Sequence, residues 1–205
     1  MIAVGCTGGI GSGKSSLVGL LAQRGAVVVD ADALARHALD PGEPSYGAVV
    51  GRFGTAVLSP DGSVDRTELA RRVFGDAAER AALEAIVHPV VSAAIAAELD
   101  ARRGSDAVVV VELPLLVETG GREAYGLDAV IVVDAPADLA VERLVRRRGL
   151  EAADARRRVA AQADAASRIR AADFVVVNVG TLDELALMAE EAWRFVERLR
   201  AERAG

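Results

Sequence analysis

Five short apolar runs recur along this chain of 205 residues, and they limit its fold more than any other feature of the sequence. They are rich in Val and Ile and occupy residues 2–6, 26–29, 107–111, 129–133 and 174–177. Each run is continuously apolar rather than alternating, which is the pattern of strands covered by helices on both faces of a parallel sheet. Longer segments of helical character separate the runs. The sequence therefore predicts an α/β fold built on a doubly wound parallel sheet.

The spacing of the runs predicts an insertion between the second and third strands. The interval from about residue 33 to 106 is too long for a single crossover, and it contains loop-forming residues at "DPGEPSYG" and "LSPDGSVD". A helical stretch follows and is expected to end at His88 and Pro89. We expect residues 36–104 to form a mostly helical subdomain.

A second insertion, residues 142–170, carries the charged stretches "ERLVRRRG" and "DARRRV". So many charges leave little surface to bury, which predicts a mobile helical hairpin that forms a lid; most charge runs are, however, only solvated helix faces. The expected organisation is one domain, 1–205, with a core made of residues 1–35, 105–141 and 171–205.

The overall composition excludes several classes. Hydrophobic residues make up 52% and charged residues 26%, which is typical of a globular protein. The formal net charge of −6 argues against nucleic acid as a partner. The Val-rich runs are too short to cross a bilayer, so we expect no membrane partner and a cytoplasmic location. Cys6, the single cysteine, lies in the first apolar run and is expected to be a small core residue in a reducing compartment.

The stretch "TGGIGSGKSS", residues 7–16, directly follows the first apolar run. It satisfies the pattern G-x-x-x-x-G-K-[ST], with a strand expected before it and a helix after it. The glycines let the backbone curl so that successive N–H groups point inward at a helix N-terminus, which forms a phosphate site. The alternative is a glycine-rich turn without a ligand. The predicted ATP-binding residues of this P-loop are Gly11, Ser12, Gly13, Lys14, Ser15 and Ser16.

Lys14 is the only lysine among 24 basic Lys and Arg side chains. A compact ammonium on a flexible stem reaches the β- and γ-phosphates, for which a planar guanidinium fits the tight loop poorly. The hydroxyl of Ser15 is placed to bind Mg²⁺, and that of Ser16 to bond an α-phosphate oxygen. We therefore predict Lys14 as a catalytic residue and Mg²⁺ as the cofactor.

Acidic residues follow two of the predicted strands. Asp30 and Asp32 stand at the carboxyl end of the second strand, where ligands of open α/β sheets bind. One of them would orient an acceptor hydroxyl and accept its proton, unless Asp32 only caps the next helix. Glu112 ends the run "AVVVVE" and either holds Mg²⁺ through a water or is an ordinary loop acid.

A P-loop alone fits both kinases and GTPase switches. A guanine-binding switch needs the tetrapeptide N-K-x-D, but the only lysine lies in the P-loop, and the only asparagine, Asn178, precedes Val179 and Gly180. The residues therefore favour a kinase, with a non-catalytic nucleotide sensor as the alternative from another class.

Several motifs together resemble the dephospho-coenzyme A kinases, which are related to nucleoside monophosphate kinases. The resemblance runs nearly end to end and covers residues 6–15, "VVDADALAR" at 28–36, "VDRTELARRVF" at 64–74, "LEAIVHPVV" at 83–91, "ELPLLVE" at 112–118, "ERLVRRRG", Gln162 and "AADFVVVNVG". It implies a P-loop NTPase fold and transfer of the ATP γ-phosphoryl group to the ribose 3′-hydroxyl of dephospho-coenzyme A, the last step of coenzyme A biosynthesis. ATP and dephospho-coenzyme A are then the partners, and we expect a monomer. Another small-molecule kinase is the alternative.

The resemblance also implies roles for catalytic residues. Lys14 matches the phosphate-binding lysine, Asp32 the catalytic base, and Arg143 a lid arginine that contacts phosphates. Where the family pattern has one arginine near Arg147, this chain has three in 146–148, so which of them contacts phosphate stays open.

The binding residues follow in the same way. Arg66 and His88 fall in the region similar to the acceptor-binding part of the family, and Asn178 falls where the family approaches the adenine. His88 is otherwise a structural histidine that ends a helix, and Asp65 with Arg66 is otherwise a surface pair.

Overall fold

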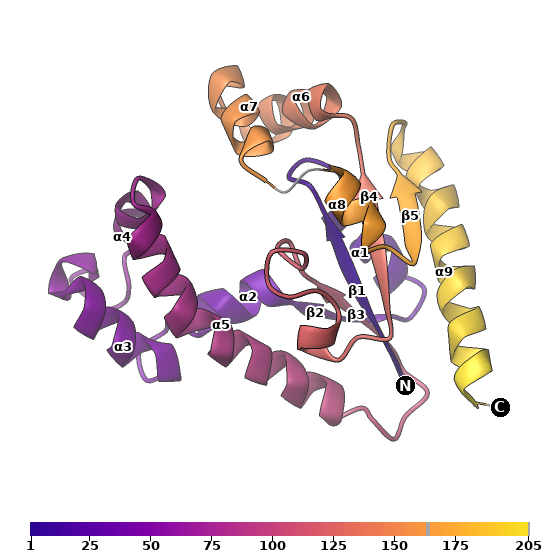
Figure 1. The fold of residues 1–205 in the computed structure, drawn as a ribbon, viewed down its shortest axis with the longest axis horizontal. Coiled ribbons are helices and arrows are strands. Elements are labelled where there is room, and N and C mark those ends of the chain that lie inside the picture. The colour runs from indigo at the N-terminus through magenta and orange to yellow at the C-terminus, as the bar shows by residue number, and fades with distance from the viewer. Residues whose placement is uncertain (163–164, 205) are drawn as a thin grey trace. The chain divides into compact units, whose positions relative to one another are not determined.

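The computed structural model describes residues 1–162 and 165–204, and Figure 1 shows its elements. One sheet holds five strands in the order β2-β3-β1-β4-β5, and every pairing is parallel. The strands are β1 (Ile2–Gly8), β2 (Val27–Asp30), β3 (Val108–Glu112), β4 (Ala129–Asp134) and β5 (Phe174–Val177). Each predicted apolar run forms a strand, which confirms the α/β class and the parallel sheet.

The chain divides into two compact units. The sheet unit comprises Met1–Asp30 and Glu98–Gly205, and the helical unit comprises Ala31–Ala97. The helical unit contains α2 (Ala31–His37), α3 (Pro44–Phe53), the 3₁₀ helix η1 (Thr55–Val57), α4 (Arg66–Phe74) and most of α5 (Ala77–Asp100). Its own small core is formed by Val49, Phe53, Val57, Val64 and Leu69. The subdomain limits of 36–104 stay a prediction.

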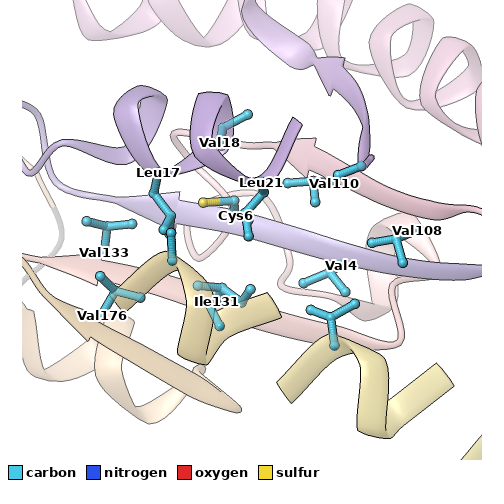
Figure 2. Close-up of a cluster of buried hydrophobic side chains, with 14 of the residues drawn as sticks. Val4, Cys6, Leu17, Val18, Leu21, Val108, Val110, Ile131, Val133 and Val176 are labelled. Carbon is cyan, nitrogen blue, oxygen red and sulfur yellow. The ribbon is translucent and has the colours of Figure 1, made fainter. Parts of the chain in front are cut away.

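The main core lies on the face of the sheet that is covered by α1 (Lys14–Ala22) and α9 (Leu182–Ala204). Alternate residues of β1, among them Val4 and Cys6, pack there against Leu17 and Leu21 of α1 (Figure 2). Burial raises the pKa of the Cys6 thiol to about 12, so the thiol stays protonated. The prediction that Cys6 is a core residue is confirmed.

On the opposite face of the sheet, side chains of the segment after β3, which includes the 3₁₀ helix η2 (Glu123–Tyr125), lie against β1. Gly5 of β1 faces this segment, and a Cβ atom at Gly5 would lie 2.7 Å from Cδ1 of Leu127. Only glycine at residue 5 therefore leaves room for this segment.

The helix α5 corrects one expectation. It does not end at His88 and Pro89 but continues to Asp100. An internal proline costs a helix about 3 kcal/mol. The turns beyond it bury Val91, Ile95 and Leu99, and each such side chain contributes about 1.5–3 kcal/mol, which outweighs that cost.

By length and composition, α5 is also the one helix of the described ranges that is long and apolar enough to cross a bilayer. The Val-rich runs considered in the sequence do not include this segment. A core helix of a soluble protein passes the same test, so the feature is weak evidence for a membrane span.

The segment expected to be a lid contains α7 (Ala152–Ala160), α8 (Ala165–Arg170) and the later part of α6 (Ala137–Arg148), which begins before residue 142. The helices α6 and α7 pack against each other as a hairpin, with Gly149 at a φ of 65° at the turn (Figure 1). Leu144 and Ala155 are buried, so the hairpin is anchored by apolar contacts despite its charges. The lid limits of 142–170 and its mobility stay predictions, and residues 163–164 within it lie outside the described residues.

Candidate active site

The predicted P-loop lies between the end of β1 and the start of α1. Gly11 and Gly13 have φ values of 78° and 97°, a region that glycine enters without the steric cost paid by other residues. The loop is tight, because the amide of Ser12 donates to the carbonyl of Gly9 at 3.1 Å. The expected order of strand, loop and helix is therefore present.

Lys14 faces an acid from the neighbouring strand. Its Nζ lies 2.5 Å from Oε1 of Glu112, and the same oxygen accepts a hydrogen bond from Oγ of Ser15 at 2.7 Å. The side chains of Lys14 and Glu112 are each 12% exposed, so the ion pair is largely shielded from solvent. The three predicted groups that would hold triphosphate and metal are thus brought together.

The two strand-end acids differ in position. Asp30 ends β2 and is the register partner of Glu112 on β3, so two carboxylates end adjacent strands. Asp32 is exposed and lies in the first turn of α2, one residue after its first residue Ala31. Asp32 therefore lies inside the helix rather than at its N-cap, in a turn where the helix dipole favours negative charge.

Arg143 and Asn178 both contact the backbone of the P-loop, at the carbonyl of Ser12. Nδ2 of Asn178 donates to the carbonyl of Ser12 at 2.7 Å, and Nη1 of Arg143 donates to the same oxygen at 3.3 Å. The Arg143 guanidinium also donates to the backbone carbonyls of Asn178 and Gly180. Burial, and then the charge of Arg147, lower the pKa of Arg143, while Glu142 acts in the opposite direction.

A cavity of about 290 Å³ opens beside these residues. It is lined by Ser16, Leu139, Glu142, Arg143, Arg146, Arg147, Asn178, Gly180, Thr181, Leu182 and Leu185. The lining therefore includes four residues predicted to be catalytic or ATP-binding, namely Ser16, Arg143, Arg147 and Asn178. Arg146 forms a salt bridge with Glu142 at 3.0 Å. Arg147 also lines the cavity, and it forms no salt bridge among the described residues.

Gln162 contacts the P-loop, although the sequence analysis did not assign it to the site. Its Oε1 accepts a hydrogen bond from the amide of Ile10 at 2.6 Å, which joins the P-loop to the segment after α7. Gln162 also lines a second cavity of about 400 Å³ beside the P-loop, together with Arg156 and Arg168. The sequence showed Gln162 only as part of a resemblance, because no spacing relates it to Ile10.

The predicted acceptor-binding residues lie in the helical unit. Nη2 of Arg66 donates to Oδ1 of Asp40 at 3.2 Å and to the carbonyl of Arg36. Asp65 is the N-cap of α4 and accepts from the amides of Thr67 and Glu68, so it does not form a surface pair with Arg66.

His88 is half-buried in the middle of α5 rather than at a helix end. Its role and that of Arg66 in acceptor binding stay predictions.

The parallel sheet and the P-loop together place the chain in the class of P-loop kinases of the α/β fold. Comparison with known proteins narrows this class to one family. The dephospho-CoA kinase family model matches residues 2–184. The dephospho-CoA kinase of Streptomyces avermitilis is 48% identical over 193 residues, which is 94% of this chain and 93% of that protein.

A second relative, the dephospho-CoA kinase of Corynebacterium jeikeium, is 45% identical over 94% of this chain and 98% of its own length. The solved structure of dephospho-CoA kinase from Campylobacter jejuni has a TM-score of 0.72 and 25% identity, covering 96% of this chain and 97% of that one. The chain belongs to the dephospho-CoA kinase family. It is accordingly an ATP-dependent kinase that transfers phosphate to a hydroxyl group.

Proposed function

We propose that this chain transfers the γ-phosphoryl group of ATP to the ribose 3′-hydroxyl of dephospho-coenzyme A, which gives coenzyme A and ADP. The observation that carries the choice of acceptor is the near full-length match to dephospho-CoA kinases, since a P-loop by itself specifies no acceptor. The reaction is the last step of coenzyme A biosynthesis.

The triphosphate binds in the P-loop. Backbone N–H groups from Gly11 to Lys14 surround the β-phosphate at the N-terminus of α1, where the helix dipole favours an anion. Lys14 extends its ammonium to the β- and γ-phosphates, and the hydroxyl of Ser16 bonds an α-phosphate oxygen. Support for these roles comes from the way that Lys14 and Ser15 converge on one oxygen of Glu112, an anionic group of the kind that a phosphate presents.

The acceptor is activated by an acid in the first turn of α2. Asp32 orients the 3′-hydroxyl and accepts its proton as the oxygen bonds to the γ-phosphorus. The bond between that phosphorus and the oxygen bridging it to the β-phosphate breaks in line, and ADP leaves. Arg66 and His88 hold dephospho-coenzyme A.

Ser15 and Glu112 fit the requirements of Mg²⁺. Both supply hard oxygen donors, and these meet at 2.7 Å. Mg²⁺ takes few protein ligands and completes its shell with phosphate oxygens and water. Ser15 would bind the ion directly and Glu112 through a water. When bound, the ion neutralises charge on the phosphate oxygens.

The remaining nucleotide contacts come from the cavity beside the P-loop. In this proposal Asn178 lies next to the adenine, and Arg147 and Arg143 approach the phosphates. Support comes from the cavity, which all three residues line. The guanidiniums of Arg143 and Arg147 would stabilise charge that develops on phosphate oxygens during transfer. The protein acts in the cytoplasm as a monomer and needs neither nucleic acid nor a membrane.

A coupled assay of ADP release tests the function. The acceptors are dephospho-coenzyme A, nucleosides and nucleoside monophosphates, each supplied with ATP and Mg²⁺. Turnover with dephospho-coenzyme A should exceed that with every other acceptor. A higher rate with another acceptor would assign a different small-molecule kinase, and slow hydrolysis that no acceptor stimulates would assign a nucleotide sensor.

A further inference from the structure

The peptide bond between Ser12 and Gly13 is held from outside the P-loop. Its carbonyl oxygen accepts hydrogen bonds from Nδ2 of Asn178 at 2.7 Å and from Nη1 of Arg143 at 3.3 Å. Ser12 is 2% exposed and Asn178 is 6% exposed, so water does not compete freely for these bonds. A short buried bond of this kind fixes the direction of the carbonyl.

The Asn178 side chain is itself held in one orientation. Its Oδ1 accepts from Nη2 of Arg143 at 3.3 Å, and the backbone N–H of Asn178 donates to the carbonyl of Asp134 at 2.8 Å. Turning the carboxamide over would put its oxygen against the Ser12 carbonyl and its NH₂ group against a guanidinium that cannot accept a hydrogen bond. The donor therefore faces Ser12.

The direction of the Ser12 carbonyl determines the direction of the next amide. A trans peptide is planar, so its C=O and the following N–H point in opposite directions. The described peptide bonds are trans, and the Ser12 carbonyl points toward Asn178 and Arg143. The N–H of Gly13 therefore points away from that pair, and this is the side on which the P-loop would present a donor to a phosphate oxygen.

The sequence at residue 13 fits this arrangement. Gly13 has a φ of 97°, and a Cβ atom there would lie 2.1 Å from Nδ2 of Asn178. Asn178 thus packs directly on the loop, and a larger residue at position 13 would push it away from Ser12.

We propose that Asn178 is a positioning residue that acts on the β-phosphate through the Ser12–Gly13 peptide, with Arg143 as its partner, and that this role does not depend on the nucleotide base. The inference rests on the proposed function, because it assumes that the P-loop binds a triphosphate. It assigns Asn178 a role in phosphate binding that a residue acting only beside the adenine would not have.

The test compares a ligand with a base and a ligand without one. The affinities for ATP and for inorganic tripolyphosphate, each with Mg²⁺, are measured by calorimetry for the wild type, Asn178→Ala and Asn178→Asp. Loss of one buried hydrogen bond should weaken both ligands by the same factor, about tenfold, in Asn178→Ala. Asn178→Asp keeps the contact with Arg143 but faces an oxygen toward the Ser12 carbonyl, so its loss should be larger. Val179→Ala, at a neighbouring residue that is 58% exposed, should change neither affinity.

The outcomes separate the possibilities. Weaker ATP binding with unchanged tripolyphosphate binding would overturn the proposal and assign Asn178 to the base, and unchanged affinity for both ligands would overturn it as well. If the wild type bound neither ligand, the proposed function itself would be wrong. A failure of the proposed function is therefore distinguishable from a failure of the role proposed for Asn178.

A measurement on the wild type covers the case in which the variants do not fold. Asn178 is the only asparagine of the chain, so labelling asparagine with ¹⁵N gives one side-chain NH₂ pair. Tripolyphosphate should shift these NH₂ signals, and the Gly13 amide signal of a glycine-labelled sample, as strongly as ATP does. NH₂ signals that move with ATP and stay in place with tripolyphosphate would contradict the proposal.

Discussion

The ammonium of Lys14 and the carboxylate of Glu112 form an ion pair of 2.5 Å across two neighbouring strand ends, with both side chains 12% exposed. Lys14 begins the helix after β1, and Glu112 ends β3, which pairs directly with β1 in the sheet. A pair so shielded leaves a costly unpaired charge when one partner is removed. Triphosphate binding to Lys14 must therefore supply a new anionic partner in place of Glu112, and the metal ion would give Glu112 a new cationic one.

Lys14→Ala should lower turnover with dephospho-coenzyme A by at least about a hundredfold, because removal of one charge-stabilising donor costs that much. The protein should lose stability, because Glu112 loses its partner, but it should still fold, since Lys14 is absent from the apolar core. The coupled ADP assay and circular dichroism measure the two effects. Arg194→Ala, which removes the cation of an exposed pair with Glu190, is the control and should leave turnover unchanged. Retained turnover in Lys14→Ala would refute the role of the lysine.

Asp32→Asn should reduce kcat far more than it weakens ATP binding, because an amide cannot accept the proton of the acceptor hydroxyl. Both properties are measured on the same protein, kcat by ADP release and the ATP dissociation constant by calorimetry. Asp183→Asn provides a matched control, since Asp183 also lies in the first turn of a helix, one residue after its start. Each substitution loses a similar helix-dipole stabilisation of about 0.3–1 kcal/mol, so a structural role alone would make the two variants behave alike.

The sheet and the P-loop were predictable because both depend on local patterns. A strand buried on two faces must be apolar at every residue, as in Val108–Glu112 up to its last position, and a phosphate loop needs glycines and a lysine at fixed spacing. The contact of Asn178 with Ser12 and that of Gln162 with Ile10 were not predictable in this way. They join residues far apart in sequence, and their geometry is set by packing of the whole sheet unit.

The helix α5 continues past Pro89, where a local sequence rule predicted its end. Proline favours a helix end, but the burial of residues such as Ile95 beyond it stabilises the continued helix. Helix propensity predicts a helix end poorly wherever burial in the tertiary structure contributes more free energy than the propensity does.

The free energy of unfolding should fall above pH 9 because of Cys6. The pKa of the buried thiol is raised from 9.0 to about 12, mainly by burial, with Lys14 opposing the shift and Glu112 adding to it. Between these two pH values the unfolded chain loses the thiol proton and the folded chain keeps it, so stability should decrease by about 1.4 kcal/mol per pH unit from this group. Urea unfolding at several pH values from 8 to 11, compared with Cys6→Ala, isolates the contribution. An equally steep decline in Cys6→Ala would assign it to other groups.

Gly5→Ala should destabilise the sheet unit, whereas Gly19→Ala should stabilise it. A methyl group at Gly5 would lie 2.7 Å from Cδ1 of Leu127 and 3.5 Å from Cδ2 of Leu116, so the covering segment has to shift, at a cost of about 1–3 kcal/mol. Gly19 lies on the exposed side of α1 with no described atom within 4 Å of an added Cβ, and alanine is favoured over glycine in a helix by about 0.8–1 kcal/mol. The two variants add the same methyl group to the same unit, so urea unfolding of both separates steric conflict from helix propensity. If Gly5→Ala were as stable as the wild type, the segment between β3 and β4 would not press on the sheet as closely as described.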